Sequence, residues 1–173
     1  MNIVTPIDSR QQTQVKLETL RFIRLAATIF HHSFKPVDIL FNLKGGASGM
    51  FCSNGTQTMI RYNPYIFAKH YAYSLSNTVP HETAHYILHC LHGPNGVRPH
   101  GDEWKQLMLQ FGVEPHRTNR LDLAGIPVRR QLRHAYSCSC TSHQISTRRH
   151  NRIKNGEARY FCRTCNGELV TAN

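Results

Sequence analysis

The amino-acid sequence predicts an α+β protein in two parts, a domain of helices around a small antiparallel sheet and a smaller C-terminal β unit. Apolar residues recur at helical spacing in residues 10–31 and again in residues 78–111. Between these stretches, residues 37–62 combine β-forming residues with Gly and Asn-Gly turn signals. Four of the six cysteines lie beyond residue 137, where the chain is too short to build a stable core without a metal.

Length and charge divide the chain in the same way. Its 173 residues suit one compact domain and a small appendage, so we expect a domain at 1–124, a basic connector at 125–135 and a C-terminal unit at 136–173. From Arg117 onward there are eleven basic and three acidic residues. Such asymmetry is typical of a nucleic-acid-binding surface, because cations neutralise phosphates and release counterions. The alternative is a solvated face that only confers solubility.

The chain shows no targeting or membrane signal. Its first residues lack a basic region followed by an apolar run, and no apolar stretch approaches 18 residues. We therefore expect a soluble, cytoplasmic monomer without a membrane partner and with reduced thiols. In that setting, clustered cysteines favour a metal site over disulfides.

Local signals place the remaining elements of the first domain. Helical periodicity, β-forming residues, the Asn54-Gly55 turn signal and the Asn63-Pro64 helix start supply them. The predicted elements are a helix at 10–31, a strand at 37–43, a hairpin of 50–53 with 57–62, a short helix from 64, and a helix at 102–111. Cys52 and Cys90 fall within predicted elements, so we expect small buried hydrophobic residues there rather than metal ligands.

The central motif is His81-Glu82-Thr83-Ala84-His85. Histidines four apart on a helix lie on one face, so both imidazoles can reach one zinc ion. Glu82 adjoins the first ligand, from where it can accept a proton from the attacking water and later give it to a leaving amine. This spacing is typical of zinc metalloproteases; the alternative is a pair of surface histidines on an ordinary helix.

The third ligand is predicted from the residues that follow. His100 is favoured, because a loop rich in Gly and Pro precedes it and can turn the chain back towards the first helix. Glu103 is the alternative for a thermolysin-like site, and His92 is a less favoured one. His89 is excluded, since it would lie about 12 Å from the first ligand. Trp104 is expected to pack beneath His100 and hold it in place.

The C-terminal cysteines predict a zinc ribbon. Cys162-x-x-Cys165, followed by Asn-Gly, is typical of one half of such a site. Cys140 belongs to the other half, and the fourth ligand is either Cys138 or His143. We favour Cys138, because four thiolates make the commonest ribbon, whereas a two-residue gap favours His143. Metal binding should supply folding free energy to a unit this small.

The ribbon also carries the basic residues expected to bind nucleic acid. Residues 145–154 and 157–161 are predicted to form two strands around Asn155-Gly156, a strong hairpin signal. Aromatic residues interleave with the basic ones, a pattern typical of backbone-tracking, sequence-tolerant binding. The candidate contacts are Arg148, Arg149, Arg152, Lys154 and Arg159.

These motifs together resemble the bacterial SprT family, whose eukaryotic relatives include the Spartan protease. The residues that carry the resemblance are HETAH, His100-Gly101, Trp104 and the stretch YSCSC…RRHNR…GEARYFCRTC. The likeness runs from about Leu20 to Val170. It implies a minimal zincin-like metalloprotease domain, with His81, His85 and His100 as zinc ligands and Glu82 as catalytic residue. In the eukaryotic relatives, that activity depends on DNA and removes proteins crosslinked to it.

The sequence therefore predicts a zinc metalloprotease that acts on proteins, including DNA-bound or DNA-crosslinked ones, with one catalytic and one structural Zn²⁺. The main alternative is a non-enzymatic regulatory protein that binds nucleic acid through two structural zinc sites. A peptidase of free small peptides is a third hypothesis, but it leaves the basic ribbon unexplained.

Overall fold

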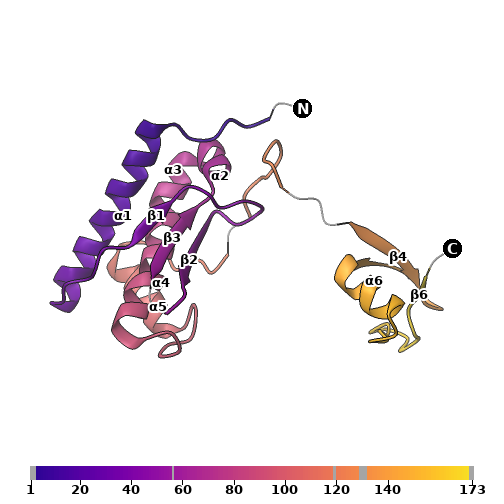
Figure 1. Cartoon of the computed structure of the whole chain (residues 1–173). Coiled ribbons are helices and arrows are strands. Elements are labelled where there is room, and N and C mark those ends of the chain that lie inside the picture. The colour runs from indigo at the N-terminus through magenta and orange to yellow at the C-terminus, as the bar shows by residue number, and fades with distance from the viewer. Residues whose placement is uncertain (1–2, 56, 119, 129–131, 172–173) are drawn as a thin grey trace. The chain divides into compact units, whose positions relative to one another are not determined.

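The computed structural model describes residues 3–55, 57–118, 120–128 and 132–171. The chain forms two compact units, Met1–Val128 and Arg129–Asn173, whose helices and strands are labelled in Figure 1. The domain limits derived from the sequence stay predictions. None of the helices in the described ranges combines the length and the apolar character that crossing a bilayer requires.

The first unit consists of helices around one small sheet. Its elements are α1 (Ser9–Phe30), β1 (Asp38–Leu40), β2 (Gly49–Ser53), β3 (Thr58–Tyr62), α2 (Pro64–Lys69), α3 (Tyr71–Tyr73), the π-helical turn η1 (Ser74–Thr78), α4 (Val79–His92) and α5 (Asp102–Gln110). All five elements predicted from local signals are present, with boundaries shifted by a few residues. The helix predicted across the His-Glu-x-x-His motif is α4.

Helix α1 begins with a capping box that its sequence encodes. The Asp8 carboxylate accepts a hydrogen bond from the Gln11 backbone N–H at 2.7 Å, and the Gln11 side chain accepts one from the Asp8 N–H at 3.2 Å. The helix ends at His31, which takes a left-handed conformation with φ of 48°. Its buried face, which includes Val15 and Phe22, forms one wall of the core.

The sheet is mixed, so the prediction of an antiparallel sheet is wrong for one of its strands. Its order is β1-β3-β2, with β2 antiparallel and β1 parallel to β3. The Asn54-Gly55 turn determines only the β2–β3 pairing, because that turn is local. Since β2 occupies one side of β3, β1 pairs on the other side. The chain then crosses back through a loop that Asn63 holds by donating to the Gly45 carbonyl at 2.9 Å.

Helix α4 lies at the centre of this unit and contacts α1, α5, β2 and β3. Figure 1 shows the sheet lying over α4, with α1 and α5 beside it. The core between them contains Ile60 and Tyr62 from β3 and Ile87 from α4, all fully buried. The buried Tyr62 hydroxyl is satisfied by Thr19 at 3.0 Å. The motif helix is therefore fixed on several sides.

The C-terminal unit is a second, independent fold. Its elements are β4 (Arg133–Ser137), β5 (Ser142–Ser146), α6 (Thr147–Lys154) and β6 (Val170–Thr171), with strand order β5-β4-β6. Its small core consists of Tyr136, Ile145, Cys162 and Leu169. Four buried residues are few for a unit of this size, so other interactions must contribute to its stability.

The predicted strand hairpin at 145–161 is wrong: residues 147–154 form helix α6. The Asn155-Gly156 pair ends this helix rather than turning a hairpin. Gly156 takes a left-handed φ of 70°, its N–H donates to the Ile153 carbonyl, and the Glu157 N–H reaches back to the Arg152 carbonyl at 2.8 Å. This is a Schellman motif, which uses the same left-handed glycine that a hairpin turn uses. Asn-Gly alone does not distinguish the two structures.

Candidate metal centres

Three histidines from two segments converge on one point. His81 and His85 are one turn apart on α4, and His100 follows the loop after that helix. Their Nε2 atoms lie 3.3 Å apart for His81 and His85, 3.0 Å for His85 and His100, and 3.1 Å for His81 and His100. Tetrahedral ligands bonded to zinc at about 2.05 Å have neighbouring nitrogens about 3.3 Å apart. The spacing therefore fits three ligands of a single ion.

The protonation of this histidine triad also fits a cation. Burial lowers the pKa of His81 to about 4 and that of His85 to about 3, and the neighbouring rings add to both effects. The pKa of His100 is lowered as well, by burial and by the charge of Arg117. Neutral imidazoles can direct lone pairs at a shared point, which is how histidines bind metals. The triad could thus hold a metal ion.

Trp104 on α5 supports the triad from one side. Its ring centroid lies 4.8 Å from that of His81, 5.8 Å from His85 and 4.8 Å from His100. The indole Nε1 is also 3.5 Å from the His81 carbonyl oxygen. The packing predicted for Trp104 is therefore confirmed, and it includes all three ligands rather than His100 alone. The His81 ring has a second support, a hydrogen bond with the His116 backbone.

The segment before α4 departs from the predicted free helix start at Pro80. Helical structure continues upstream through the π-helical turn η1, and the Val79 N–H bonds to the Ser74 carbonyl, five residues back. Proline lacks an N–H and its ring crowds the preceding turn. The wider turn relieves that crowding and lets the helix run on to the motif. It also places Tyr73 and Asn77 beside His81, in a shared cavity.

Glu82 is buried next to the triad and faces strand β2. Its carboxylate accepts a hydrogen bond from the Phe51 backbone N–H at 2.8 Å. Burial raises the pKa of Glu82 to about 7, although this hydrogen bond lowers it in part. A carboxyl group with a pKa near neutrality can both accept and donate a proton. The arrangement therefore suits acid–base chemistry beside a metal.

Gly49 makes this arrangement sterically feasible. A Cβ atom at that position would lie 2.5 Å from Glu82 Cγ and 2.8 Å from Thr78 Cγ2. Any larger residue would push the carboxylate away from the triad. The sequence offered one signal that we did not use for the site, a glycine-rich run from Gly45 to Gly49 just before a strand.

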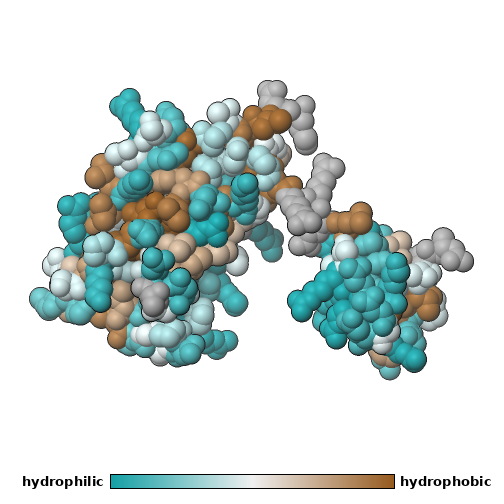
Figure 2. Space-filling model, viewed as in Figure 1, coloured by the Kyte–Doolittle hydropathy of each residue, from teal (hydrophilic) through white to brown (hydrophobic). Residues whose placement is uncertain are grey.

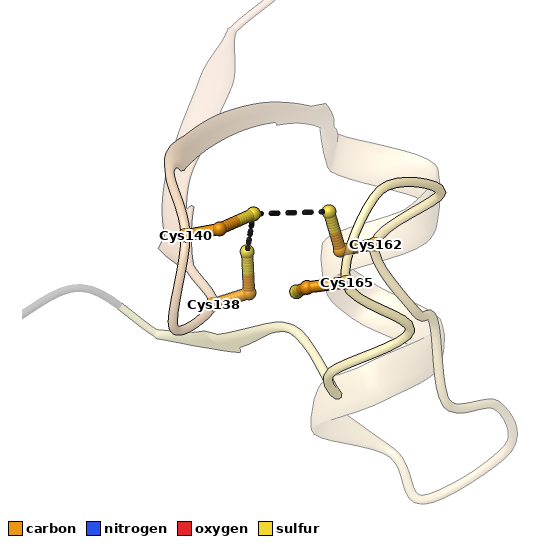
Figure 3. A group of neighbouring side chains, drawn as sticks. All are labelled: Cys138, Cys140, Cys162 and Cys165. Atoms are coloured by element: carbon orange, nitrogen blue, oxygen red, sulfur yellow. Dashed lines mark hydrogen bonds between the residues drawn. The ribbon is translucent and has the colours of Figure 1, made fainter.

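Four cysteines form the second centre, in the C-terminal unit. Figure 3 shows Cys138 and Cys140 on one side and Cys162 and Cys165 on the other, with their sulfur atoms turned towards one another. Cys140 Sγ lies 3.4 Å from Cys138 Sγ and 3.6 Å from Cys162 Sγ. Sulfurs bound to one tetrahedral zinc are about 3.8 Å apart, whereas disulfide sulfurs are about 2.05 Å apart. The group could hold a metal ion and is not disulfide-bonded.

Hydrogen-bond donors surround these sulfurs. The backbone N–H groups of Cys165 and Thr164 lower the pKa of Cys162 to about 5. The Ser139 hydroxyl and the Gly167 N–H lower that of Cys165. These donors favour thiolates, which are the metal-binding form.

Cys140 behaves differently, because its pKa rises to about 12 through hydrogen bonds with the other three cysteines. Several neighbouring thiolates repel one another, so full ionisation of the group requires a cation among them. His143 lies just outside the group, with Nε2 3.3 Å from Cys138 Sγ. It is therefore placed to donate to that sulfur rather than to replace it.

Comparison with known proteins places the chain among its relatives. The SprT-like family model matches residues 19–131, more than half of the chain. The chain belongs to the SprT-like family. It is 32% identical to Protein SprT of Pasteurella multocida over 158 residues, which cover 91% of this chain and 92% of that protein. It is 35% identical to Protein SprT of Vibrio parahaemolyticus over 148 residues, or 85% and 86% of the two chains. No solved structure gives a significant match.

The residues predicted to bind nucleic acid lie mostly on α6 instead of a β-hairpin. Arg148, Arg149, Arg152 and Lys154 are exposed on that helix, and Arg159 follows it. Figure 2 shows the hydrophilic surface of this unit on the side where α6 lies. Three of the five cations have partners within the unit. Arg152 lies 4.0 Å from Glu157, Arg159 lies 3.7 Å from Glu168, and Arg149 packs over the Tyr160 ring.

Other candidate ligands lie apart from both centres. Among the described residues, Glu103, His92 and His89 are not part of the histidine group. His89 instead packs against the Phe51 ring at 5.2 Å. Cys90 is exposed on α4, so the expectation that it is a buried hydrophobic residue is wrong. That expectation used only its helical position, which does not specify the face.

Proposed function

We propose that this protein is a zinc-dependent metalloendopeptidase whose zinc is bound by His81, His85 and His100. The observation that carries the proposal is the convergence of three Nε2 atoms within 3.3 Å beside a buried carboxyl group. A triad of protein ligands leaves one position open, which is typical of catalytic rather than structural zinc. A closed site for a purely structural ion needs a fourth protein ligand, and none is present among the described residues.

The chain's own residues divide the chemistry between them. Zinc, when bound, polarises the scissile carbonyl and acidifies the attacking water. Glu82 accepts the proton of that water and passes it to the leaving amine, which a pKa near 7 allows in both directions. The Phe51 N–H holds one carboxylate oxygen in place during both transfers. Trp104 and the His116 backbone keep the imidazoles in position.

Strand β2 supplies a surface for the substrate backbone. It is an edge strand of its sheet, because β3 occupies only one of its sides. The Phe51 N–H that reaches Glu82 belongs to the outer side, so this edge runs past the triad. An extended peptide can pair with such an edge through main-chain hydrogen bonds. We therefore propose that substrates bind in extended form, which favours unfolded or flexible segments of proteins.

The C-terminal unit is proposed to recruit those proteins. Cys138, Cys140, Cys162 and Cys165 would bind a structural zinc, and the cations on α6 would contact nucleic-acid phosphates. Substrate proteins that are bound or crosslinked to DNA would then be brought near the peptidase unit. The concentration of positive charge on one helix supports this partner over free peptides.

Replacing Glu82 with Gln tests the mechanism. The variant keeps the shape of the side chain but cannot accept the proton, so cleavage of a DNA-bound protein should fall at least about 100-fold. Zinc content and DNA binding should stay unchanged. Glu103→Gln is the matched control, because this exposed carboxylate is close in sequence to His100 but outside the histidine group. Cleavage that persists in Glu82→Gln would exclude the proposed role.

A further inference from the structure

A cavity of about 230 Å³ opens directly onto the proposed catalytic groups. His81 and Glu82 form one part of its wall, and Gly49 at the start of β2 forms another. An extended backbone paired with the outer edge of β2 would pass this opening next to the triad. The side chain of the residue adjoining the scissile bond would therefore enter this space, which we call the Glu82 cavity.

Polar groups predominate on the walls of the Glu82 cavity. Tyr73, Asn77 and Thr78 line it from the helical segment before the motif, and Met108 is the main apolar contact. The Thr78 hydroxyl bonds to Ser48, and the Asn77 amide donates to the Tyr73 carbonyl. An apolar side chain would gain little in such a site and would displace water from polar groups. The cavity is thus built for a polar or charged side chain.

The rim of the cavity carries the charge that decides between these. It is formed by Glu114, His116 and Arg117. Glu114 and His116 pair with each other at 3.2 Å. Arg117 is exposed and has no carboxylate within 4 Å among the residues the structure describes. It is therefore the unpaired charge at this opening.

The position of Arg117 is set by the active centre itself. The preceding residue, His116, is bonded through its backbone to the His81 ring. Arg117 also lines a second hollow next to the Glu82 cavity, whose wall includes His100. The guanidinium is thus held close to the triad from a fixed point of the chain. A guanidinium offers paired donors that match a carboxylate.

We infer that the Glu82 cavity is a specificity pocket and that Arg117 makes it select an acidic side chain, Asp or Glu, next to the scissile bond. This inference rests on the proposed peptidase function and names its substrate preference. Because Arg117 is exposed, solvent and salt screen its charge. We therefore expect a discrimination of roughly tenfold between acidic and basic side chains rather than an absolute one.

The first test measures binding and needs no turnover. Three peptide hydroxamates share one backbone and carry Glu, Gln or Lys beside the zinc-binding group; their affinities for the zinc-loaded full chain are measured by calorimetry. The wild type should bind the Glu compound roughly tenfold more tightly than the Lys compound. Arg117→Gln should lose this preference and Arg117→Glu should reverse it. Arg120→Glu, an exposed change three residues away, should retain it.

An order of affinities that is the same in wild type and Arg117→Glu would overturn the inference, as would failure of every hydroxamate to bind zinc-loaded wild type. Mapping of cleavage sites in a DNA-bound protein separates the two proposals. Cleavage without charge selectivity would refute the pocket and keep the peptidase. Charge-selective hydroxamate binding without any cleavage would keep the pocket and refute the peptidase.

Discussion

The two metal centres use different means to prepare their ligands. In the histidine triad, burial keeps imidazoles neutral, and three ligands from a helix and a loop leave one position open. In the cysteine group, four sulfurs close the site, and backbone N–H donors stabilise thiolates at the surface of a small unit. An open site next to a buried carboxyl group suits chemistry, whereas a closed thiolate site suits folding. The difference predicts that metal loss affects the two units unequally.

Removal of metal should have the largest effect, and only on the C-terminal unit. Structural zinc supplies on the order of 10 kcal/mol to small zinc domains, whereas the first unit has a large core of its own. A strong chelator, or the double substitution Cys162→Ser and Cys165→Ser, should unfold residues 133–171 while Met1–Val128 stays folded. Hydrogen exchange resolved by segment measures this. Equal protection of both units after chelation would contradict the comparison.

Substitution of Gly49 by Ala should disturb the open centre without touching a ligand. The added methyl group meets Glu82 Cγ at 2.5 Å, so the carboxylate must move. We expect about 1–3 kcal/mol lower stability, from overpacking. Cleavage should fall roughly tenfold or more as Glu82 leaves its place beside the triad. Thermal unfolding and initial rates check both effects, with Ser53→Ala at the exposed end of β2 as control. Unchanged rates would show that Glu82 tolerates displacement.

Trp104→Phe should weaken zinc binding at the triad alone. The smaller ring keeps the core filled but loses part of the contact with the three imidazoles. Loss of supporting contacts costs about 10–100-fold in metal affinity, and we expect the lower end for this mild change. Competition with a zinc-binding dye gives the two affinities separately. Leu107→Val, elsewhere on α5 and equally buried, is the control and should leave both affinities unchanged.

The smallest effect is expected at the basic helix α6. Replacing Arg148 and Lys154 with Gln should lower the salt dependence of DNA binding by about one log unit of slope per lost phosphate contact. Fluorescence anisotropy with single-stranded DNA at several salt concentrations measures this slope. The same charge change at Lys16 and Arg24 on α1 should leave it unaltered. An equal effect from both pairs would mean that net charge, rather than α6, determines binding.

Local spacing made much of this structure predictable. The interval between His81 and His85 equals one helical turn, and the Cys162-x-x-Cys165 pair lies within one tight turn. The loop before His100 contains the glycines and prolines needed to reverse the chain. Each of these groups was therefore brought together by residues close in sequence, and the structure places them as the spacing indicated.

The features that were missed depend on contacts distant in sequence. Nothing near β1 specifies that it pairs in parallel with β3, and nothing near Gly49 specifies that it packs on Glu82, 33 positions later. The Asn155-Gly156 pair has two structural meanings, and the choice between them depends on whether the preceding residues form a helix. The role of the His116 backbone had no sequence signal, because any residue has a carbonyl group.

The measurement that tests the central claim most directly is zinc content combined with cleavage. Elemental analysis of the wild type should give two zinc ions per chain, and His81→Ala with His85→Ala should give one. Cleavage of a DNA-bound protein should require DNA and should be lost in that variant. Two zinc ions in both proteins would show that the triad is not a metal site, and full zinc loading without cleavage under any condition would contradict the assignment of this centre as catalytic.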